Sequence, residues 1–344
     1  MYRTGCHGKG DVMSRPTIYS LAAELQVSPS TVSRAFSRPE KVRPEVRERI
    51  LKAAALVDYH PSVAARTLAT GRTGLVGVLV PDITNPFFPP LLRSLRWMAT
   101  SYGMEVMFID SGETIRTEER LVAQVRGQVD AFIMASPRSP VERLVEASGT
   151  TPVTFINRTH PGMSATYCDD DDAIFAAVSH LDSLGHGSIA LVEGPERSWS
   201  GQRRSLAVAA AAAELHVDVI SAGHFPASYE GGRCSAPALA RSGASAALVF
   251  DDVMACGVIA GLAEMGLSVP REFSLVGCDD VPFAAMLTPQ LTTITAPVAQ
   301  MGATAVELMW DRLQHPGAAP QVVPHRSSLT VRGTTARPGR TSRS

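Results

Sequence analysis

The sequence predicts an α/β protein in two parts: a small helical head at the N-terminus, then a larger body of two lobes built on parallel sheets. Three observations favour this fold class. Apolar residues in 17–59 recur at helical spacing in three short segments. From residue 75 onward, runs typical of buried strands alternate with runs typical of helices. The chain also has 344 residues, which is too long for one ordinary domain.

The head opens with two short helices joined by a tight turn. Four apolar residues from Ile18 to Leu25 fall at i, i+3, i+4 and i+7, which is one face of a helix. Ser28 is suited to cap a second helix over residues 29–36, because its hydroxyl can accept an unpaired amide and Pro29 fits the first position. The outer face of that helix is small and polar. We interpret the pair as a helix-turn-helix whose second helix fits the major groove of DNA; the alternative is an ordinary helical hairpin.

A third helix is predicted over residues 42–59, with Pro44 in its opening turn. Its apolar face, which closes a small core, is made of Val46, Ile50, Ala53 and Val57. Residues 1–72 hold 12 Lys and Arg against 6 Asp and Glu, a net charge of +6, while the remainder of the chain carries −7. A basic head on an acidic body is typical of a polyanion-binding module fused to something else.

The composition excludes several classes of protein. The chain is 45% hydrophobic and 19% charged, as in an ordinary globular protein, and it has no apolar run of about 18 residues that would span a membrane. The N-terminus lacks the pattern of a secretory signal. Five scattered cysteines, without C-x-x-C spacing, stand at positions 6, 168, 234, 256 and 278. We therefore expect reduced thiols in a cytoplasmic protein, with no membrane partner and no zinc site. The predicted DNA-binding head leads us to expect that the protein is nucleoid-associated.

The body contains two successive series of strands and helices. The first series has strands at 75–80, 105–109, 131–135 and 153–156, and helices at 89–102, 117–125 and 141–147. The second has strands at 188–192, 247–250, 275–276 and 292–294, and helices at 172–184, 201–215, 253–265 and 298–313. Such alternation builds parallel sheets covered on both faces. Two of them imply two lobes, with a ligand cleft at the carboxyl ends of the strands.

The motifs of common enzymes are absent. The sequence contains no G-x-x-x-x-G-K-[ST], H-E-x-x-H or G-x-S-x-G. The acidic run 169–172 could suggest a metal site, but it stands where a helix starts, and carboxylates there complement the helix dipole. His180 and His186 are interpreted as packing or capping residues. We therefore expect no catalytic residue, no cofactor and no metal.

Three stretches carry a family resemblance: VSPSTVSRAF, YHPSVAARTLATGRTGLVGVLVPDITNPFF, and VGCDD followed by PQLTTI. Together they closely resemble the LacI/GalR family of bacterial repressors, over about residues 15–333. The resemblance implies an N-terminal three-helix helix-turn-helix DNA-binding head and a two-lobed, periplasmic-binding-protein-like α/β effector domain. It also implies a ligand-responsive repressor of carbohydrate uptake or catabolism genes, which binds a pseudo-palindromic double-stranded operator as a dimer. Its effector would be a small sugar or sugar derivative in the cleft between the lobes.

The resemblance assigns DNA contacts to the head and to the segment after it. The first two and the sixth residues of the family's second helix face base edges, and these are Pro29, Ser30 and Arg34 here. Residues 62–69 resemble the family's conditional hinge helix, in which Leu68 would open a base step from the minor groove; the alternative is a linker with one buried leucine. The expected DNA contacts are Thr17, Tyr19, Ser28, Pro29, Ser30, Thr31, Ser33, Arg34, Ser37, Lys41, Ser62, Ala64, Ala65 and Leu68. Each serine or threonine could instead belong to a solvated helix face.

The resemblance also assigns an effector site in the cleft. Its expected residues are Asp82, Asn85, Phe87, Phe88, Arg204, Asp251 and Asp279. Carboxylates and an arginine beside aromatic rings suit a polyhydroxylated ligand. Asp251 stands where most members carry asparagine, which leaves an acceptor without a donor and disfavours a phosphorylated or carboxylated ligand. As alternatives, Phe87 or Phe88 could be core residues, and Asp279 could cap a turn.

The expected domains follow from these assignments. Residues 1–13 would be a disordered tail, either a gene-start artefact or a basic arm, and we favour the artefact. The DNA-binding head would span 14–60, the hinge helix or linker 61–73, and the effector-binding and dimerisation domain 74–333. Its first lobe would hold about 74–168 and 296–320, its second about 169–295 and 321–333, and 334–344 would be a disordered tail. Helix 298–313 carries apolar positions for a partner, and the tail has no leucine heptads, so we expect a homodimer and not a tetramer. The alternative function is a stand-alone sugar-binding or sugar-modifying protein whose helical head does not bind DNA.

Overall fold

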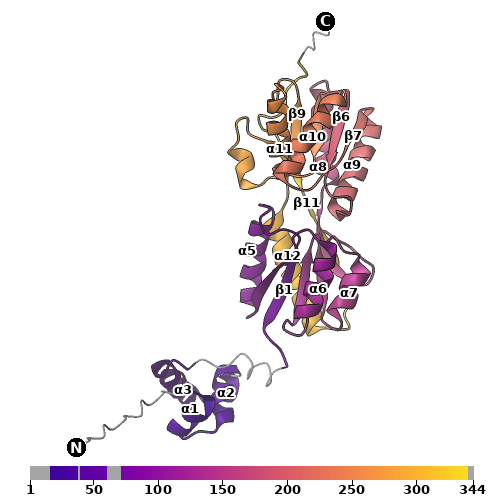
Figure 1. Ribbon diagram of the computed structural model, residues 1–344. Coiled ribbons are helices and arrows are strands. Elements are labelled where there is room, and N and C mark those ends of the chain that lie inside the picture. Colours follow the sequence, from indigo (N-terminus) through magenta and orange to yellow (C-terminus); the bar gives the residue numbers. More distant parts are fainter. Residues whose placement is uncertain (1–15, 38, 60–70, 340–344) are drawn as a thin grey trace, which may run out of the picture. The chain divides into compact units, whose positions relative to one another are not determined.

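The computed structural model describes residues 16–37, 39–59 and 71–339. Contacts divide the chain after Thr73 into an N-terminal unit and a C-terminal unit (Figure 1). Among the described residues, no helix is long and apolar enough to cross a membrane. The expected tail 1–13 and the expected hinge residues lie outside the described residues; those hinge residues are Ser62, Ala64, Ala65 and Leu68.

The N-terminal unit is a group of short helices. Its elements are α1 (Ile18–Glu24), α2 (Pro29–Ser37), the 3-10 helix η1 (Pro39–Lys41) and α3 (Pro44–Leu56). Thr17 begins α1 with a reciprocal cap, because its hydroxyl accepts the Ser20 amide at 3.1 Å and its amide donates to the Ser20 hydroxyl at 2.9 Å. Ser28 begins α2 as predicted, since its hydroxyl accepts the Thr31 amide at 3.1 Å.

A small apolar core holds these helices together. It contains Leu21, Ala22, Val32, Ala35, Ile50, Ala54 and Tyr59. The helix predicted over 42–59 is shorter than expected and ends at Leu56. Val57, predicted on its buried face, is 37% exposed, so that part of the prediction is wrong. The chain turns after the helix instead, and Tyr59 meets the Phe36 ring edge-on with the centroids 6.0 Å apart.

The C-terminal unit contains two six-stranded sheets, one in each lobe. The first has the order β11-β5-β4-β3-β1-β2, with β1 (Leu75–Val80), β2 (Glu105–Asp110), β3 (Ala131–Ala135), β4 (Val153–Ile156), β5 (Ser164–Asp169) and β11 (Val322–Arg326). The second has the order β12-β10-β9-β8-β6-β7, with β6 (Ser188–Glu193), β7 (Asp218–His224), β8 (Ala246–Val249), β9 (Ser274–Asp279), β10 (Thr292–Thr295) and β12 (Ser328–Thr330). Neighbouring strands are parallel except β10 and β12. Each sheet therefore gathers the carboxyl ends of its parallel strands at one edge.

Helices cover both faces of each sheet (Figure 1). In the first lobe, α5 (Phe88–Ser101) and α12 (Val298–Gln314) pack on one face, and α6 (Ile115–Val125) and α7 (Val141–Ser148) on the other. In the second, α8 (Asp171–Ser183) and α9 (Trp199–Leu215) cover one face, and α10 (Tyr229–Arg241) and α11 (Asp252–Glu264) the other, with the 3-10 helix η2 (Pro282–Ala285) following β9. The α/β fold class is thus confirmed.

The sequence analysis does not predict β5, β7 or α10, and each of these departs from the usual pattern. β5 carries polar residues, and β7 is a half-exposed edge strand, so neither shows a buried apolar run. α10 contains Pro237 and two adjacent glycines, which disfavour an isolated helix. Gly232 is needed because α10 packs closely on α11: a Cβ there would lie 2.0 Å from the Met254 carbonyl oxygen. A Cβ on Gly231 would lie 2.1 Å from the Pro226 carbonyl oxygen, in the segment before the helix.

β11 corrects the expected boundary between the lobes. The sequence predicts that residues 321–333 complete the second lobe, and this is wrong for β11, which pairs in parallel with β5 of the first sheet. The Thr166 hydroxyl also donates to the Val323 carbonyl at 2.9 Å. The chain then crosses over, and β12 joins the second sheet. The sequence does not predict this pairing, because β11 is an edge strand that alternates in burial and contains Pro324.

The segment 334–339 corrects a second expectation, since the tail predicted to be disordered from residue 334 is folded against the second lobe at its start. Thr334 is fully buried, and its hydroxyl accepts the Thr292 amide and donates to the Leu275 carbonyl, both at 2.8 Å. The Ala336 carbonyl lies 2.9 Å from His186 Nε2. His186 therefore has the packing role predicted for it, and it ties the C-terminal segment to the sheet.

We expect Thr334→Val to lower the free energy of unfolding by about 1–3 kcal/mol, because it leaves the buried Thr292 amide without its acceptor. Urea denaturation followed by circular dichroism measures this. Ser183→Ala serves as the control: it removes an exposed hydroxyl that donates to the His180 carbonyl in its own helix, and the change should stay under about 0.5 kcal/mol. An unchanged midpoint for Thr334→Val would show that this residue does not anchor the segment.

Candidate functional site

The outer face of α2 carries the side chains predicted to read base edges. Ser30 and Arg34 are both exposed, and their spacing of four residues places them on one face of the helix. The Ser28 hydroxyl lies 2.8 Å from both the Ser30 and the Thr31 hydroxyl, so Ser28 is engaged in capping the helix. Among the other predicted contacts, Pro29, Thr31 and Ser33 are half-buried, and Ser37 ends α2.

Basic side chains lie beside this face. Arg34, Lys41 and Arg43 line one hollow of about 220 Å³. Tyr19 on α1 is 72% exposed, which leaves its ring available to a partner. Thr17 is exposed as well, but its hydroxyl caps α1. Cations beside a polar helix face are suited to hold phosphate groups while the helix reads bases.

In the C-terminal unit, Arg204 forms the centre of a second site. The Arg204 Nε donates to Asp170 Oδ2 at 2.7 Å, Nη2 to Asp279 Oδ1 at 3.3 Å, and Nη1 to the Phe250 carbonyl at 3.0 Å. The Arg204, Asp170 and Asp279 side chains are 12%, 7% and 9% exposed. Ser198 helps to position Arg204 by capping α9. Its hydroxyl accepts the Gly201 amide at 3.1 Å, and the helix therefore begins about one turn before the arginine.

Asp279 is the last residue of β9, and a turn follows it. Its φ of 104° is rare for a residue other than glycine and costs energy. The next residue, Asp280, fixes the turn by accepting from Arg332 at 2.6 Å. Burial raises the pKa of Asp279, to about 7; the Arg204 guanidinium opposes the rise, and neighbouring carboxylates add to it. A carboxyl with this pKa changes its charge near neutral pH.

Asp251 links the two lobes. It caps α11, with Oδ1 accepting the Met254 amide at 2.7 Å, and Oδ2 accepts from Asn85 Nδ2 of the first lobe at 3.2 Å. Asp251 is 2% exposed, and burial raises its pKa. Asn85 is held in turn by the Phe87 amide, which donates to Asn85 Oδ1 at 3.0 Å. One amide and one carboxylate therefore join the lobes at the cleft.

A small cavity of about 40 Å³ lies between the lobes at this point. The first lobe lines it with Asn85, Phe87, Phe88, Glu113, Ser136, Arg138 and Asn157, and the second with Ser198, Ser200, Arg204, Ala227, Phe250, Asp251 and Asp279. Six of the seven predicted effector residues are thus brought together. Asp82 is not among the lining residues, because its Oδ1 accepts the Thr84 amide and hydroxyl at 2.8 and 2.6 Å and holds a turn.

Phe87 and Phe88 are core residues, which was one of the two interpretations offered for them, and they also line the cavity. Their side chains are 7% and 5% exposed and belong to the apolar core of the first lobe. Their rings also meet edge-on, with centroids 5.1 Å apart, at the wall of the cavity. They form an apolar surface on the first-lobe side, opposite the charged groups of the second lobe.

Several lining residues are missed by the sequence analysis. Ser136 and Asn157 directly follow β3 and β4 with positive φ, so polar residues after buried strands were a signal that could have found them. Arg138 pairs with Glu113 at 2.8 Å and is 8% exposed. Asp170, the strongest partner of Arg204, stands within the acidic run interpreted as a helix-dipole feature. Burial alone would raise its pKa, but the charge and hydrogen bonds of Arg204 hold that pKa below its usual value.

Two residues of the acidic run have the role predicted for them, whereas Asp169 is the last residue of β5. Asp171 and Asp172 lie in the first turn of α8, and Asp171 accepts from Arg203 at 3.2 Å. Among the described residues, no group of three or more His, Cys, Asp and Glu side chains is arranged to hold a metal ion.

Comparison with known proteins matches both parts of the chain. Residues 17–62 match the family described as bacterial regulatory proteins, lacI family, and residues 178–335 match the periplasmic binding protein-like domain. The sequence is 31% identical to catabolite control protein A of Priestia megaterium, over 90% of this chain and 97% of that protein.

Solved structures agree with this comparison. The lac repressor dimer bound to operator and the anti-inducer ONPF is similar with a TM-score of 0.82 and 25% identity, over 94% of this chain and 100% of that one. A LacI family transcriptional regulator from Enterococcus faecium with bound ribose is similar with a TM-score of 0.68 and 28% identity, over 76% of this chain and 99% of that one. With both regions matched and a relative at this identity over nearly its whole length, the chain belongs to the LacI family of bacterial transcriptional regulators.

Proposed function

We propose that this protein is a repressor of carbohydrate uptake or catabolism genes that binds a pseudo-palindromic operator as a homodimer and is controlled by a small sugar-like effector. The observation that carries the proposal is the cleft around Arg204, which joins a buried guanidinium, two carboxylates and aromatic rings on the same chain as a helix-turn-helix. A gel-shift assay with fragments from upstream of its own gene, with and without candidate sugars, tests it.

The charges of the cleft support a neutral, polyhydroxylated effector. Glu113, Asp170, Asp251 and Asp279 stand against Arg138 and Arg204, an excess of carboxylates. Both arginines already have carboxylate partners, at 2.8 Å for Arg138 and 2.7 Å for Arg204. A phosphate or carboxylate on the ligand would meet unbalanced negative charge, whereas hydroxyls can donate to the carboxylates while ring C–H groups contact Phe87 and Phe88. The similar regulator with bound ribose carries a ligand of this kind.

The operator would be read by α2 and by the hinge. Arg34 is placed to give guanine O6 and N7 a two-pronged contact, with Ser30 and Pro29 beside it. Thr17, Tyr19, Ser28, Thr31, Ser33, Ser37 and Lys41 would contact phosphates or flank the reading helix. In the hinge, Ser62, Ala64, Ala65 and Leu68 would contact the minor groove, with Leu68 as the wedge.

A second copy of the chain is the proposed partner of an apolar face on the first lobe. On α5 and β2, Trp97 is 70% exposed and Phe108 is 42% exposed, and both line a hollow of about 690 Å³. β2 is also an edge of the first sheet, which proteins usually cover. The lac repressor that this chain resembles is a dimer.

The apolar positions of α12 were expected to contact a second copy of the chain. They do not form this surface, because Met301, Ala305, Val306 and Met309 are buried in the first-lobe core.

Binding of the effector would change DNA binding by changing the separation of the lobes. The Asn85–Asp251 hydrogen bond crosses the cleft, so an effector that bonds to Asp251 and Arg204 competes with it. Movement of one lobe against the other in each copy would change the spacing of the two heads. The coupling expected for such a switch is about 1–3 kcal/mol, and it acts in both directions: operator and effector change each other's affinity by the same factor.

The alternative is a sugar-binding or sugar-modifying protein whose head does not bind DNA. The same gel-shift assay separates the two, because this alternative predicts no shift at any sugar concentration. The exposed Ser30 and Arg34, beside the cations at Lys41 and Arg43, favour the repressor.

Arg34→Ala should weaken operator binding about 10- to 100-fold and leave affinity for random DNA within about threefold of wild type, because it removes a base-edge contact and keeps the phosphate contacts. Fluorescence anisotropy with both DNAs at one salt concentration measures this. Lys41→Ala is the control and should lower both affinities by a similar factor. Equal losses for Arg34→Ala on the two DNAs would make Arg34 a phosphate contact.

Trp97→Ser should convert the dimer to monomer at micromolar concentration, because it removes a large aromatic anchor from the centre of the proposed interface. Light scattering gives the mass. Leu206→Ser on α9 is a matched control, with a leucine that is 72% exposed against 70% for Trp97, and it should remain dimeric. A Trp97→Ser variant that keeps the wild-type mass would place the interface elsewhere.

The pKa of about 7 for Asp279 predicts a pH dependence of effector binding. Below this pH the carboxyl is protonated and accepts ligand hydroxyls less well, so affinity should be present above pH 7 and fall as the pH drops, at most about tenfold per pH unit. Titration calorimetry with a sugar selected by thermal shift measures this. Asp279→Asn should flatten the profile, whereas Asp82→Asn, a turn carboxylate away from the cleft, should keep it. A profile that Asp279→Asn does not alter would assign the proton to another group.

A further inference from the structure

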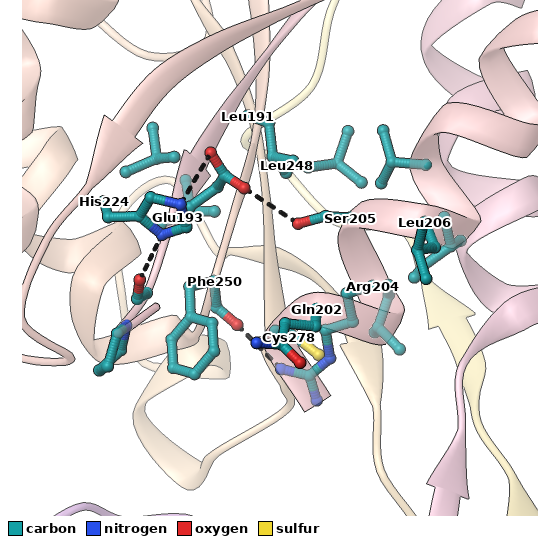
Figure 2. A pocket seen from close by; sticks show the side chains of 18 of the residues that line it. Leu191, Glu193, Gln202, Arg204, Ser205, Leu206, His224, Leu248, Phe250 and Cys278 are labelled. Carbon is teal, nitrogen blue, oxygen red and sulfur yellow. Dashed lines mark hydrogen bonds and ion pairs between the residues drawn. The ribbon is translucent and has the colours of Figure 1, made fainter. Parts of the chain in front are cut away.

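A second and larger cavity lies inside the second lobe, on the other side of Arg204 from the cleft. It has a volume of about 580 Å³ and lies between α9 and strands β6 and β8 (Figure 2). Pockets for small molecules commonly have volumes of about 300–1,000 Å³. This cavity belongs to one lobe alone, because its lining residues run from Ile174 to Ile294 and include none of the first lobe.

Small residues on α9 leave this space open. Gly201 and Ser205 line the cavity on the first turns of the helix. Larger side chains at these positions would fill the gap between helix and sheet, as they do in ordinary close-packed cores. The inner walls are apolar and are formed by Ile174, Leu191, Val208, Leu248 and Ile294. The body of a ligand in this cavity must therefore be apolar.

The mouth of the cavity is polar and acidic. Glu193 Oε1 accepts from the Ser205 hydroxyl at 3.1 Å (Figure 2). Its Oε2 accepts from the Ser221 hydroxyl at 2.7 Å. His224 Nε2 lies 3.8 Å from Glu193 Oε2, while its Nδ1 is 2.9 Å from the Gly194 carbonyl. The Glu193 and His224 side chains are 16% and 44% exposed, so this end faces solvent. A carboxylate has about four acceptor positions, so Glu193 keeps capacity for a donor on a ligand.

Phe250 and Arg204 form the wall between this cavity and the cleft. The Phe250 ring lies against two glycines: a Cβ on Gly194 would be 2.4 Å from the ring, and one on Gly201 would be 3.2 Å from it. The Arg204 guanidinium stands 5.8 Å from the centroid of the same ring. Both residues line both cavities, so the two spaces are neighbours separated by one layer of side chains.

We propose that the cavity between α9 and the second sheet is a second small-molecule site, for a ligand with an apolar ring system and one hydrogen-bond donor, either a hydroxyl or an amine. The ring would lie among Leu191, Val208 and Leu248, and the donor would reach Glu193 at the mouth. A ligand with a carboxylate at that position would meet the Glu193 charge and be rejected. This site is distinct from that of the sugar effector, because it lies within the second lobe and its lining is suited to a ligand of different chemistry.

The test uses the full chain and 2-naphthol, a fluorescent probe with an apolar ring system and a single hydroxyl. Titration calorimetry should give a dissociation constant below about 100 μM, within reach of a ligand of this size. 2-Naphthoate, which has the same rings and a carboxylate, should bind at least tenfold more weakly. Val208→Phe fills the cavity and should abolish 2-naphthol binding. Glu193→Ala removes the acceptor at the mouth and should weaken binding about tenfold.

Asn85→Ala is the matched control, because it alters the cleft between the lobes without touching the second cavity. It should bind 2-naphthol like the wild type. Thermal unfolding of every variant confirms the fold, and Glu193→Ala at the exposed mouth keeps the test valid if Val208→Phe does not fold. The proposal is overturned if 2-naphthol does not bind the wild type, if 2-naphthoate binds as well, or if binding survives in both Val208→Phe and Glu193→Ala.

Discussion

The end of the second lobe that faces the cleft depends on one buried guanidinium. Arg204 reaches from α9 to Asp170 before α8, to the backbone after β8 and to Asp279 at the end of β9, so a single side chain joins four segments. Removing one member of a buried ion pair leaves an uncompensated charge and costs about 3–5 kcal/mol. These segments therefore keep one relative position whether or not the cleft is occupied. A ligand can add hydrogen bonds to this group, but a ligand that displaces either carboxylate would expose the same cost.

Much of the fold follows from the sequence where one local signal agrees with the tertiary structure. The caps at Thr17 and Ser28 are local, and the central strands are apolar on both faces because helices cover both sides. The prediction fails where the structure of a segment depends on the elements packed against it. α10 is a helix despite its glycines and Pro237 because α11 lies so close. β11 belongs to the first sheet because β5 offers it an edge, which no property of its own residues reveals.

The candidate site, like the fold, could be predicted from the sequence only in part. Arg204, Asp251 and Asp279 were named from the family resemblance, and the structure brings them together at one cavity. Asp170 and Arg138 could not be found in this way, because their importance lies in partners distant in sequence: Arg204 lies 34 residues from the first, and Glu113 lies 25 from the second. The cavity behind Phe250 corresponds to no sequence motif. The small residues Gly201 and Ser205 line it on α9, which in the sequence looks like an ordinary alanine-rich helix.

The way the C-terminal segment is tied to the second lobe has a consequence for the protein as it leaves the ribosome. The head, over residues 16–59, makes its core from neighbours close in sequence, so a nascent chain can fold it early. Both lobes need residues synthesised much later: the first needs α12 and β11, and the second needs β12 and the bonds of Thr334 to Leu275 and Thr292. Translation that stops before these residues would release a folded head attached to an incomplete effector domain. Such a fragment would retain the exposed face of α2 without the two complete lobes that follow it in the full chain.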